Sequence, residues 1–170
     1  MDQIEWKETE EHIPAEGSLF SFCQENHIKF GEIDNPDGPV TFIAKQAIEG
    51  LLEFLANDKT REHGGVLIGQ PYWDSHLRLF FVVITAAIPA YQTEGSPVHL
   101  QFTPDSWDFI SGLIDENFPD QIVIGWYHSH PRLGVFMSST DQATQKAFFN
   151  HPWNLSVVVD PIAHKSGWFA

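Results

Sequence analysis

Short apolar runs alternate along this chain with segments of helical spacing, and this alternation constrains the fold more than any other feature. The runs are rich in β-branched and aromatic residues, which favour β-strands. They are VTFIA (40–44), GGVLIGQPYW (64–73), HLRLFFVVITAAI (76–88), DQIVIGWYHSH (120–130) and LSVVVD (155–160). A sheet built from such strands has apolar faces that helices must cover.

Segments with the pattern of amphipathic helices lie between these runs. The first is KQAIEGLLEFLAND (45–58), the second follows Thr103 and Pro104, and the third is DQATQKAFFN (141–150). Thr103 is a favoured N-cap residue, and proline is favoured at the first helical position. The pattern predicts an α/β or α+β fold, in which a mixed or largely antiparallel sheet is flanked by two or three helices.

The chain divides at a turn-rich segment, DNPDGP (34–39). Before it lies one alternating stretch, HIKFGEI (27–33), within an otherwise mixed and polar region. All of the helical segments and the apolar runs lie after it. We therefore expect an N-terminal extension over residues 1–38 and a single main domain over residues 39–170.

The charge of the chain excludes some partners. It has 23 acidic and 9 basic residues, which gives a formal net charge of −14. Because the sequence has no cluster of Lys or Arg, we expect no nucleic-acid binding. Such a charge steers a basic protein partner towards the molecule, and the alternative is that it only keeps the protein soluble.

Three observations bear on the compartment. The longest apolar run, LFFVVITAAI, is about half of the 18 to 20 residues that a membrane span needs. The first residues, MDQIEWKETEEHIPAEG, are acidic and polar, unlike a secretory signal. Cys23 is the only cysteine, so neither an internal disulfide framework nor a Cys-rich zinc site is expected. We expect a soluble, cytoplasmic protein that does not associate with membranes.

Two histidines end the run at 120–130. Side chains alternate along a strand, so His128 and His130 lie on one face and Ser129 on the other. Two imidazoles on one face make half of a metal site, because neutral imidazole is a common zinc ligand. The alternative is a pair of surface histidines at the end of a strand.

Ser138 and Asp141 have two competing explanations. Ser-x-x-Asp before a helix is a capping box, in which each side chain accepts a backbone N–H of the other residue. Ser139 and Gln142 offer an alternative capping box one residue later, which would leave the side chains of Ser138 and Asp141 available for a role other than capping. Asp141 would then complete a set of two histidines and one carboxylate. Three protein ligands with one open position are typical of catalytic zinc.

These residues together resemble the JAMM/MPN family of zinc-dependent isopeptidases. The signature of that family is a distant glutamate, then His-x-His-Pro, then Ser-x-x-Asp. The chain carries every element, as EHGGVLIG and HSHPRLGVFMSSTD: Glu62, His128, His130, Pro131, Ser138 and Asp141. The resemblance covers roughly residues 40–170 and implies an MPN-like domain with a curved sheet. A short, lone domain resembles the bacterial members in particular.

The resemblance also implies a role for each residue. His128, His130 and Asp141 would bind one Zn²⁺ per chain, with water as the fourth ligand. Glu62 would act as the general base, and Ser138 would hydrogen-bond the oxyanion of the tetrahedral intermediate. His63 adjoins Glu62, but the resemblance does not make it a ligand, because His128, His130 and Asp141 already fill the protein positions around the metal.

The family mostly cleaves amide bonds at the C-terminal tail of ubiquitin or ubiquitin-like proteins. The expected partners are therefore a ubiquitin-like protein and its conjugates, and an extended tail can bind as an added strand. The candidate walls of the groove are the 87–102 loop and PRLGVF (131–136), where Gly134 would admit a backbone and Leu133, Val135 and Phe136 would supply apolar contacts. The alternative is that these three apolar side chains pack in the core.

Deconjugation, precursor processing and release of an amino acid from a sulfur carrier all stay open. Two other classes of protein compete with a hydrolase. Two histidines and a carboxylate also suit a non-haem Fe(II) oxygenase, although such an enzyme has no use for Glu62 or Ser138. The family also includes non-catalytic interaction modules that have lost the metal site, but no ligand is missing here.

Overall fold

The structure is a computed structural model that describes residues 13–22, 27–29, 38–91, 94–95 and 100–170. Its helices are the 3₁₀ helix η1 (Leu19–Phe22), α1 (Lys45–Asn57), α2 (Pro104–Asn117) and α3 (Ser139–Phe148). Its strands are β1 (Ala15–Glu16), β2 (His27–Lys29), β3 (Val40–Ala44), β4 (Gly64–Asp74), β5 (Leu79–Pro89), β6 (Glu94–Gly95), β7 (Leu100–Gln101), β8 (Ile122–Ser129), β9 (Leu155–Asp160) and β10 (Lys165–Phe169).

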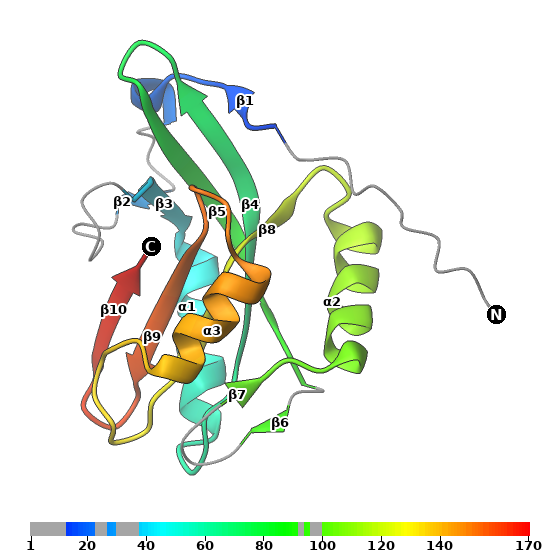
Figure 1. Cartoon of the computed structure of the whole chain (residues 1–170), viewed down its shortest axis with the longest axis vertical. Helices are drawn as coiled ribbons and strands as arrows, with labels where there is room; N and C mark the ends of the chain where they lie inside the picture. The colour runs from blue at the N-terminus through cyan, green and yellow to red at the C-terminus, as the bar shows by residue number, and fades with distance from the viewer. Residues whose placement is uncertain (1–12, 23–26, 30–37, 92–93, 96–99) are drawn as a thin grey trace, which may run out of the picture.

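The main sheet is mixed, as the sequence predicts. Its strand order is β10-β9-β8-β4-β5-β3-β2, and β1 pairs with the far end of β4. The pairs β8–β9 and β3–β5 are parallel, whereas β4 is antiparallel to both β5 and β8. Strands β4 and β5 form a long hairpin that runs along the molecule (Figure 1). Register shifts in β4 near Ile68 let the sheet curl.

Helices cover both faces of this sheet, as alternation along β4 shows. Leu67 belongs to the apolar cluster under α1, whereas its neighbours Val66 and Ile68 belong to the cluster under α2 and the end of α3. The prediction of an α+β domain with two or three flanking helices is confirmed for the described residues, in which α1, α2 and α3 flank the sheet. None of the described helices combines the length and apolar character needed to cross a membrane.

Described parts of the predicted extension also contact the sheet. β2 pairs with β3, and η1 places Leu19 and Phe22 on a small apolar cluster around Phe81. Of the predicted alternating stretch 27–33, the structure describes only β2, and most of the turn at 34–39 also lies outside the described residues. The division at residue 38 stays a prediction. The start of the predicted loop at 87–102 belongs to β5, and a later part of it forms the short pair β6–β7.

Paired glycines bring β4 close to the strand that carries the histidines. Gly64 lies opposite His128 in the antiparallel pair, and Gly65 lies opposite Tyr127. A Cβ added at Gly64 would lie 2.0 Å from the carbonyl oxygen of Tyr127. Only glycine fits such an approach, so the start of β4 is held directly against the end of β8.

Candidate metal and catalytic site

His128 near the end of β8 and His130 directly after the strand both lie in the protein interior. His128 stacks on Trp126 with 4.3 Å between ring centroids, on the face covered by α2 and α3. His128 and His130 are 0% and 1% exposed, so the alternative of surface histidines is wrong. Their Nε2 atoms lie 3.1 Å apart. The alternation of a strand thus delivers two converging imidazoles, as predicted.

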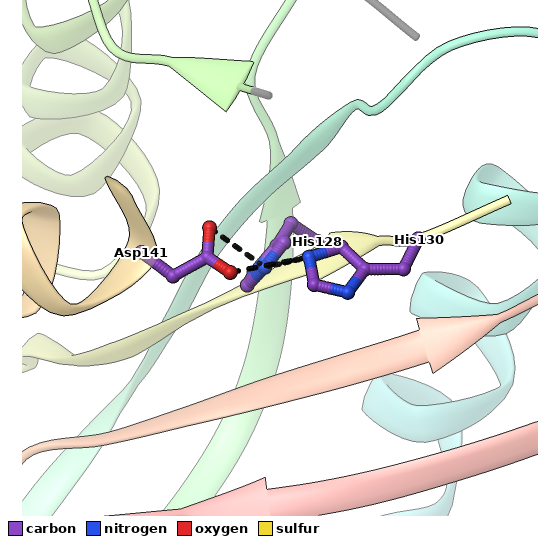
Figure 2. Close-up of side chains that lie close together, drawn as sticks. All are labelled: His128, His130 and Asp141. Carbon is purple, nitrogen blue, oxygen red and sulfur yellow. Dashed lines mark hydrogen bonds and ion pairs between the residues drawn. The ribbon is translucent and has the colours of Figure 1, made fainter. Parts of the chain in front are cut away.

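Asp141 joins the two histidines from the first turn of α3. Its Oδ1 lies 3.2 Å from Nε2 of His128, and its Oδ2 lies 3.2 Å from Nε2 of His130 (Figure 2). The carboxylate is 1% exposed. The end of β8 and the start of α3, which one loop connects, therefore bring three potential metal ligands close together.

The same carboxylate also caps α3. Oδ2 of Asp141 accepts the backbone N–H of Ser138 at 2.8 Å, and Oγ of Ser138 accepts the backbone N–H of Asp141 at 3.1 Å. The alternative box at Ser139 and Gln142 is therefore wrong. Capping does not turn Asp141 away from the histidines, because a carboxylate oxygen can accept from more than one donor. The same side chain can therefore cap the helix and serve as a potential metal ligand.

The three side chains lie close enough together to hold a metal ion. Ligand atoms bound to zinc at about 2.0 Å lie about 3.3 Å from one another in a tetrahedron. The Nε2 atoms of the two histidines lie 3.1 Å apart, and each lies 3.2 Å from a different oxygen of Asp141; one ligand atom from each of the three residues lies within 4.8 Å of the others. Within the described ranges, these are the residues that come together as a possible metal site. Nitrogen and oxygen donors in this number suit zinc, and they also suit Fe(II).

Burial and neighbouring charges set the protonation of the group. Burial alone would raise the pKa of Asp141, but hydrogen bonds with His128 and His130 lower that pKa far below its usual range. Burial lowers the pKa of His128, against the opposing effect of Asp141. Burial also acts to lower the pKa of His130, yet Asp141 and Glu62 raise it overall. A carboxylate and a neutral His128 are the protonation states that metal binding requires.

Glu62 lies beside this group on the segment that leads into β4. Its Oε1 is 3.5 Å from Nε2 of His130, and the residue is 1% exposed. No hydrogen-bond partner for Oε2 exists among the described residues. Burial, with a smaller contribution from the charge of Asp141, raises the pKa of Glu62 to about 7. This buried carboxyl can exchange a proton near neutral pH.

His63 points away from the site, although it directly follows Glu62. Its Nε2 lies 3.2 Å from the carbonyl oxygen of Leu55, and its ring packs on Phe54 with 4.6 Å between centroids. It does not belong to the group of potential metal ligands. The geometry agrees with the expectation that this histidine is not a ligand.

The loop between His130 and Ser138 holds the predicted substrate-contact residues. Leu133 and Phe136 are 43% and 44% exposed, so they do not pack in the core. The Phe136 ring lies 4.9 Å from that of His130. Val135 is half-buried against Gly167 of β10, and Gly134 has a φ of 88°, which favours glycine. Their role towards a substrate stays a prediction.

Asp160 anchors this loop, and the sequence analysis did not identify it. The residue is 2% exposed, and its carboxylate accepts backbone N–H groups of Arg132 and Gly134 in the loop. It also accepts those of Ile162 and Ala163 in the turn after β9. An aspartate that ends a strand indicates such a turn. The contact with a loop 26 to 28 residues away has no local sequence signal.

Comparison with known proteins identifies the family. The protein family described as JAB1/Mov34/MPN/PAD-1 ubiquitin protease matches residues 42–151. This chain belongs to that family. The matched range contains Glu62, both histidines, Ser138 and Asp141, so the predicted signature lies within the JAB1/Mov34/MPN/PAD-1 domain. The expected likeness to bacterial members in particular stays a prediction.

Relatives in this JAB1/Mov34/MPN/PAD-1 family include proteasome subunits. The 26S proteasome regulatory subunit rpn11 of Schizosaccharomyces pombe is 48% identical over 138 residues, which is 79% of this chain and 42% of the relative. The ubiquitin carboxyl-terminal hydrolase RPN11 of Saccharomyces cerevisiae is 51% identical over 56 residues, or 32% of this chain and 18% of the relative. The chain thus spans less than half the length of these relatives.

A solved structure supports the fold. The solution structure of a protein from Desulfitobacterium hafniense aligns with a TM-score of 0.52 and 21% sequence identity. The alignment covers 75% of this chain and 80% of that protein. At this identity the likeness concerns the arrangement of the helices and strands alone.

Proposed function

We propose that this chain is a zinc-dependent isopeptidase that hydrolyses the amide bond at the C-terminal tail of a ubiquitin-like protein, either from conjugates or from a precursor. The observation that carries the proposal is the buried group of His128, His130 and Asp141, with the carboxyl of Glu62 beside it. We further propose one zinc ion per chain and a cytoplasmic location.

The three ligands would hold the metal. When bound, zinc supplies a Lewis acid that polarises the scissile carbonyl and makes hydroxide available at neutral pH. Asp141 contributes the negative charge that offsets the cation, and the capping bond from the N–H of Ser138 fixes the direction of its Oδ2. His128 and His130 approach from a buried strand, which limits their rotation.

Glu62 moves the proton. Its carboxylate takes the proton of the attacking water and delivers it to the leaving amine. A pKa of about 7, caused chiefly by burial, lets the same group accept and return a proton near neutral pH. The position of Oε1, 3.5 Å from Nε2 of His130, places the base next to the ligands and outside their set.

Ser138 stabilises the oxyanion. Its Oγ accepts the N–H of Asp141, and this bond uses a lone pair of the hydroxyl. The O–H proton therefore stays available to donate to the oxygen that becomes negative during the attack. Because the capping bond fixes the side chain, the donor is in place before the substrate arrives.

The surroundings of the site support an extended, glycine-rich tail as substrate. Leu133 and Phe136 expose apolar surface beside His130, and both lie on the loop that includes Gly134. Extended tails bind through main-chain bonds and apolar contacts of this kind. The net charge of −14 favours a partner with a basic face and makes association sensitive to salt.

Mass spectrometry of ubiquitin-like fusions and conjugates tests the proposal. Zinc-loaded protein should cut after the C-terminal tail, chelator should abolish the cut, and Glu62→Gln should lower the rate by about 10²-fold. Equal cleavage of unstructured peptides would remove the ubiquitin-like partner. Binding of conjugates without turnover would favour an interaction module, and bound iron without hydrolysis would favour an oxygenase.

A further inference from the structure

Ser129 lies between the two histidines, on the opposite face of β8. It is 0% exposed, so its hydroxyl needs partners within the protein. Both partners are backbone groups of one residue in another segment, His63. Oγ of Ser129 accepts the backbone N–H of His63 at 3.2 Å and donates to the carbonyl of His63 at 3.4 Å. The backbone N–H of Ser129 donates to the same carbonyl at 2.9 Å.

These bonds extend the β4–β8 pairing by one residue beyond Gly64, the first residue of β4. Glu62 precedes the bonded residue His63 and lies outside the strand. The contacts of Ser129 therefore join β8 directly to the chain that carries the Glu62 carboxyl. The two histidines thus lie on one face of the chain at the end of β8. On the opposite face, Ser129 hydrogen-bonds the backbone of His63, the residue next to Glu62.

We propose that Ser129 is a positioning residue that sets the place of Glu62 relative to His128 and His130, an inference that rests on the proposed function for its effect on catalysis. Without the hydroxyl, the buried N–H of His63 loses its acceptor, and the segment can shift to find another. A misplacement of about 1 Å in a reacting group can cost about 10²-fold in rate. The metal ligands should keep their places, because His130 is held separately by the bond from its N–H to Val159.

The first test is kinetic and uses Ser129→Ala with a matched control. Ser106→Ala removes a hydroxyl that is also 0% exposed but belongs to the cap of α2. We expect Ser129→Ala to keep about one zinc per chain and an unchanged KM, while kcat falls by about 10²-fold. Ser106→Ala should keep zinc, KM and kcat. Equal losses of kcat in the two variants would mean that Ser129 acts only on general stability.

A double variant separates positioning from an independent effect. If Ser129 acts through Glu62, the combined variant Ser129→Ala/Glu62→Gln should be no slower than Glu62→Gln alone. Rates that fall by the product of the two single effects would overturn the proposal. The test compares ratios of rates. If a variant loses a modest share of folded protein, each rate can be divided by the zinc content of the sample to correct for that loss.

The third test does not depend on activity and can therefore fail separately from the proposed function. With Co²⁺ as the bound metal, the pseudocontact shift of the ¹³C-labelled side-chain carboxyl of Glu62 reports its place relative to the histidines. We expect this shift to change in Ser129→Ala and to match wild type in Ser106→Ala. Hydrogen exchange at the amide of His63 should also become faster in Ser129→Ala. Unchanged Glu62 shifts and unchanged His63 exchange would overturn the inference, whether or not any substrate is cleaved.

Discussion

Helices α2 and α3 begin with the same capping box, yet only one of the boxes belongs to the site. In α2, Thr103 and Ser106 exchange backbone N–H bonds of 2.7 and 3.1 Å. In α3, Ser138 and Asp141 exchange bonds of 2.8 and 3.1 Å. The third helical position is serine in one box and aspartate in the other. The aspartate adds a charge and a second oxygen, so the cap of α3 also offers a potential metal ligand, and the capping bonds fix its direction.

The largest effect should come from making the α3 box resemble that of α2. Asp141→Ser keeps a side chain that can accept the N–H of Ser138, but it removes the carboxylate from His128 and His130. We expect zinc to be lost and activity to fall by about 10³-fold or more, with little change in helix content. Metal analysis and circular dichroism of the variant check this. Retention of zinc would show that Asp141 is a cap alone.

A second variant separates the two roles of Ser138. Glycine is a tolerated N-cap residue, so Ser138→Gly should cost only a few tenths of a kcal/mol in stability. It removes the O–H, and we expect kcat to fall by about 10² to 10³-fold with zinc retained. Steady-state kinetics and thermal melts on the same preparation measure both. Full activity in this variant would assign Ser138 to capping only.

An aspartate in another strand anchors the loop that leads to the α3 box. Asp160 holds Arg132 and Gly134 in the loop between the histidines and Ser138. In Asp160→Ala these N–H groups lose their acceptor, and we expect about a tenfold loss of activity together with a lower melting temperature. The matched control is Asp74→Ala, which releases the N–H of Leu19 and two N–H groups of a turn outside the site. Equal activity losses in the two variants would contradict a specific role for the anchor.

The smallest effect belongs to the α2 box. Thr103→Ala removes a cap worth about 1 kcal/mol and should lower the melting temperature by about 2 to 4 °C. Because neither Thr103 nor Ser106 belongs to the group of potential metal ligands, we expect activity and zinc content to stay at wild-type levels. Kinetics at 25 °C, where the variant remains folded, check this. A loss of zinc in Thr103→Ala would mean that the two caps are coupled.

Most of the fold could be predicted from periodicity. The apolar runs form β3, β4, β5, β8 and β9, and the Thr103–Pro104 signal marks the start of α2, because strand alternation and capping act over a few residues. The pairing of β1 with β4 and the anchoring of Leu19 on Asp74 could not be predicted. These contacts join segments about 55 residues apart and leave no local pattern.

In the site, too, the features set by neighbouring residues could be predicted, and those set by distant contacts could not. Strand alternation predicts that His128 and His130 share a face, and the structure confirms it. Sequence reasoning treated the cap and the ligand as competing roles of Asp141, because spacing alone does not show that one carboxylate can satisfy both. Neither Ser129 nor Asp160 was identified, since each acts through hydrogen bonds to a distant backbone. The burial that raises the pKa of Glu62 also depends on tertiary packing.

Zinc content of variants at the site is the sharpest test of the proposed metal centre, because the metal is assigned to three side chains and to no others. We predict about one zinc per chain in wild type, in Glu62→Gln and in His63→Ala, and almost none in His128→Ala, after identical loading and dialysis. His63→Ala is the matched control, because this buried histidine adjoins Glu62 but contacts the carbonyl of Leu55. A wild-type protein that binds no zinc, or a His128→Ala variant that binds as much as wild type, would contradict the account.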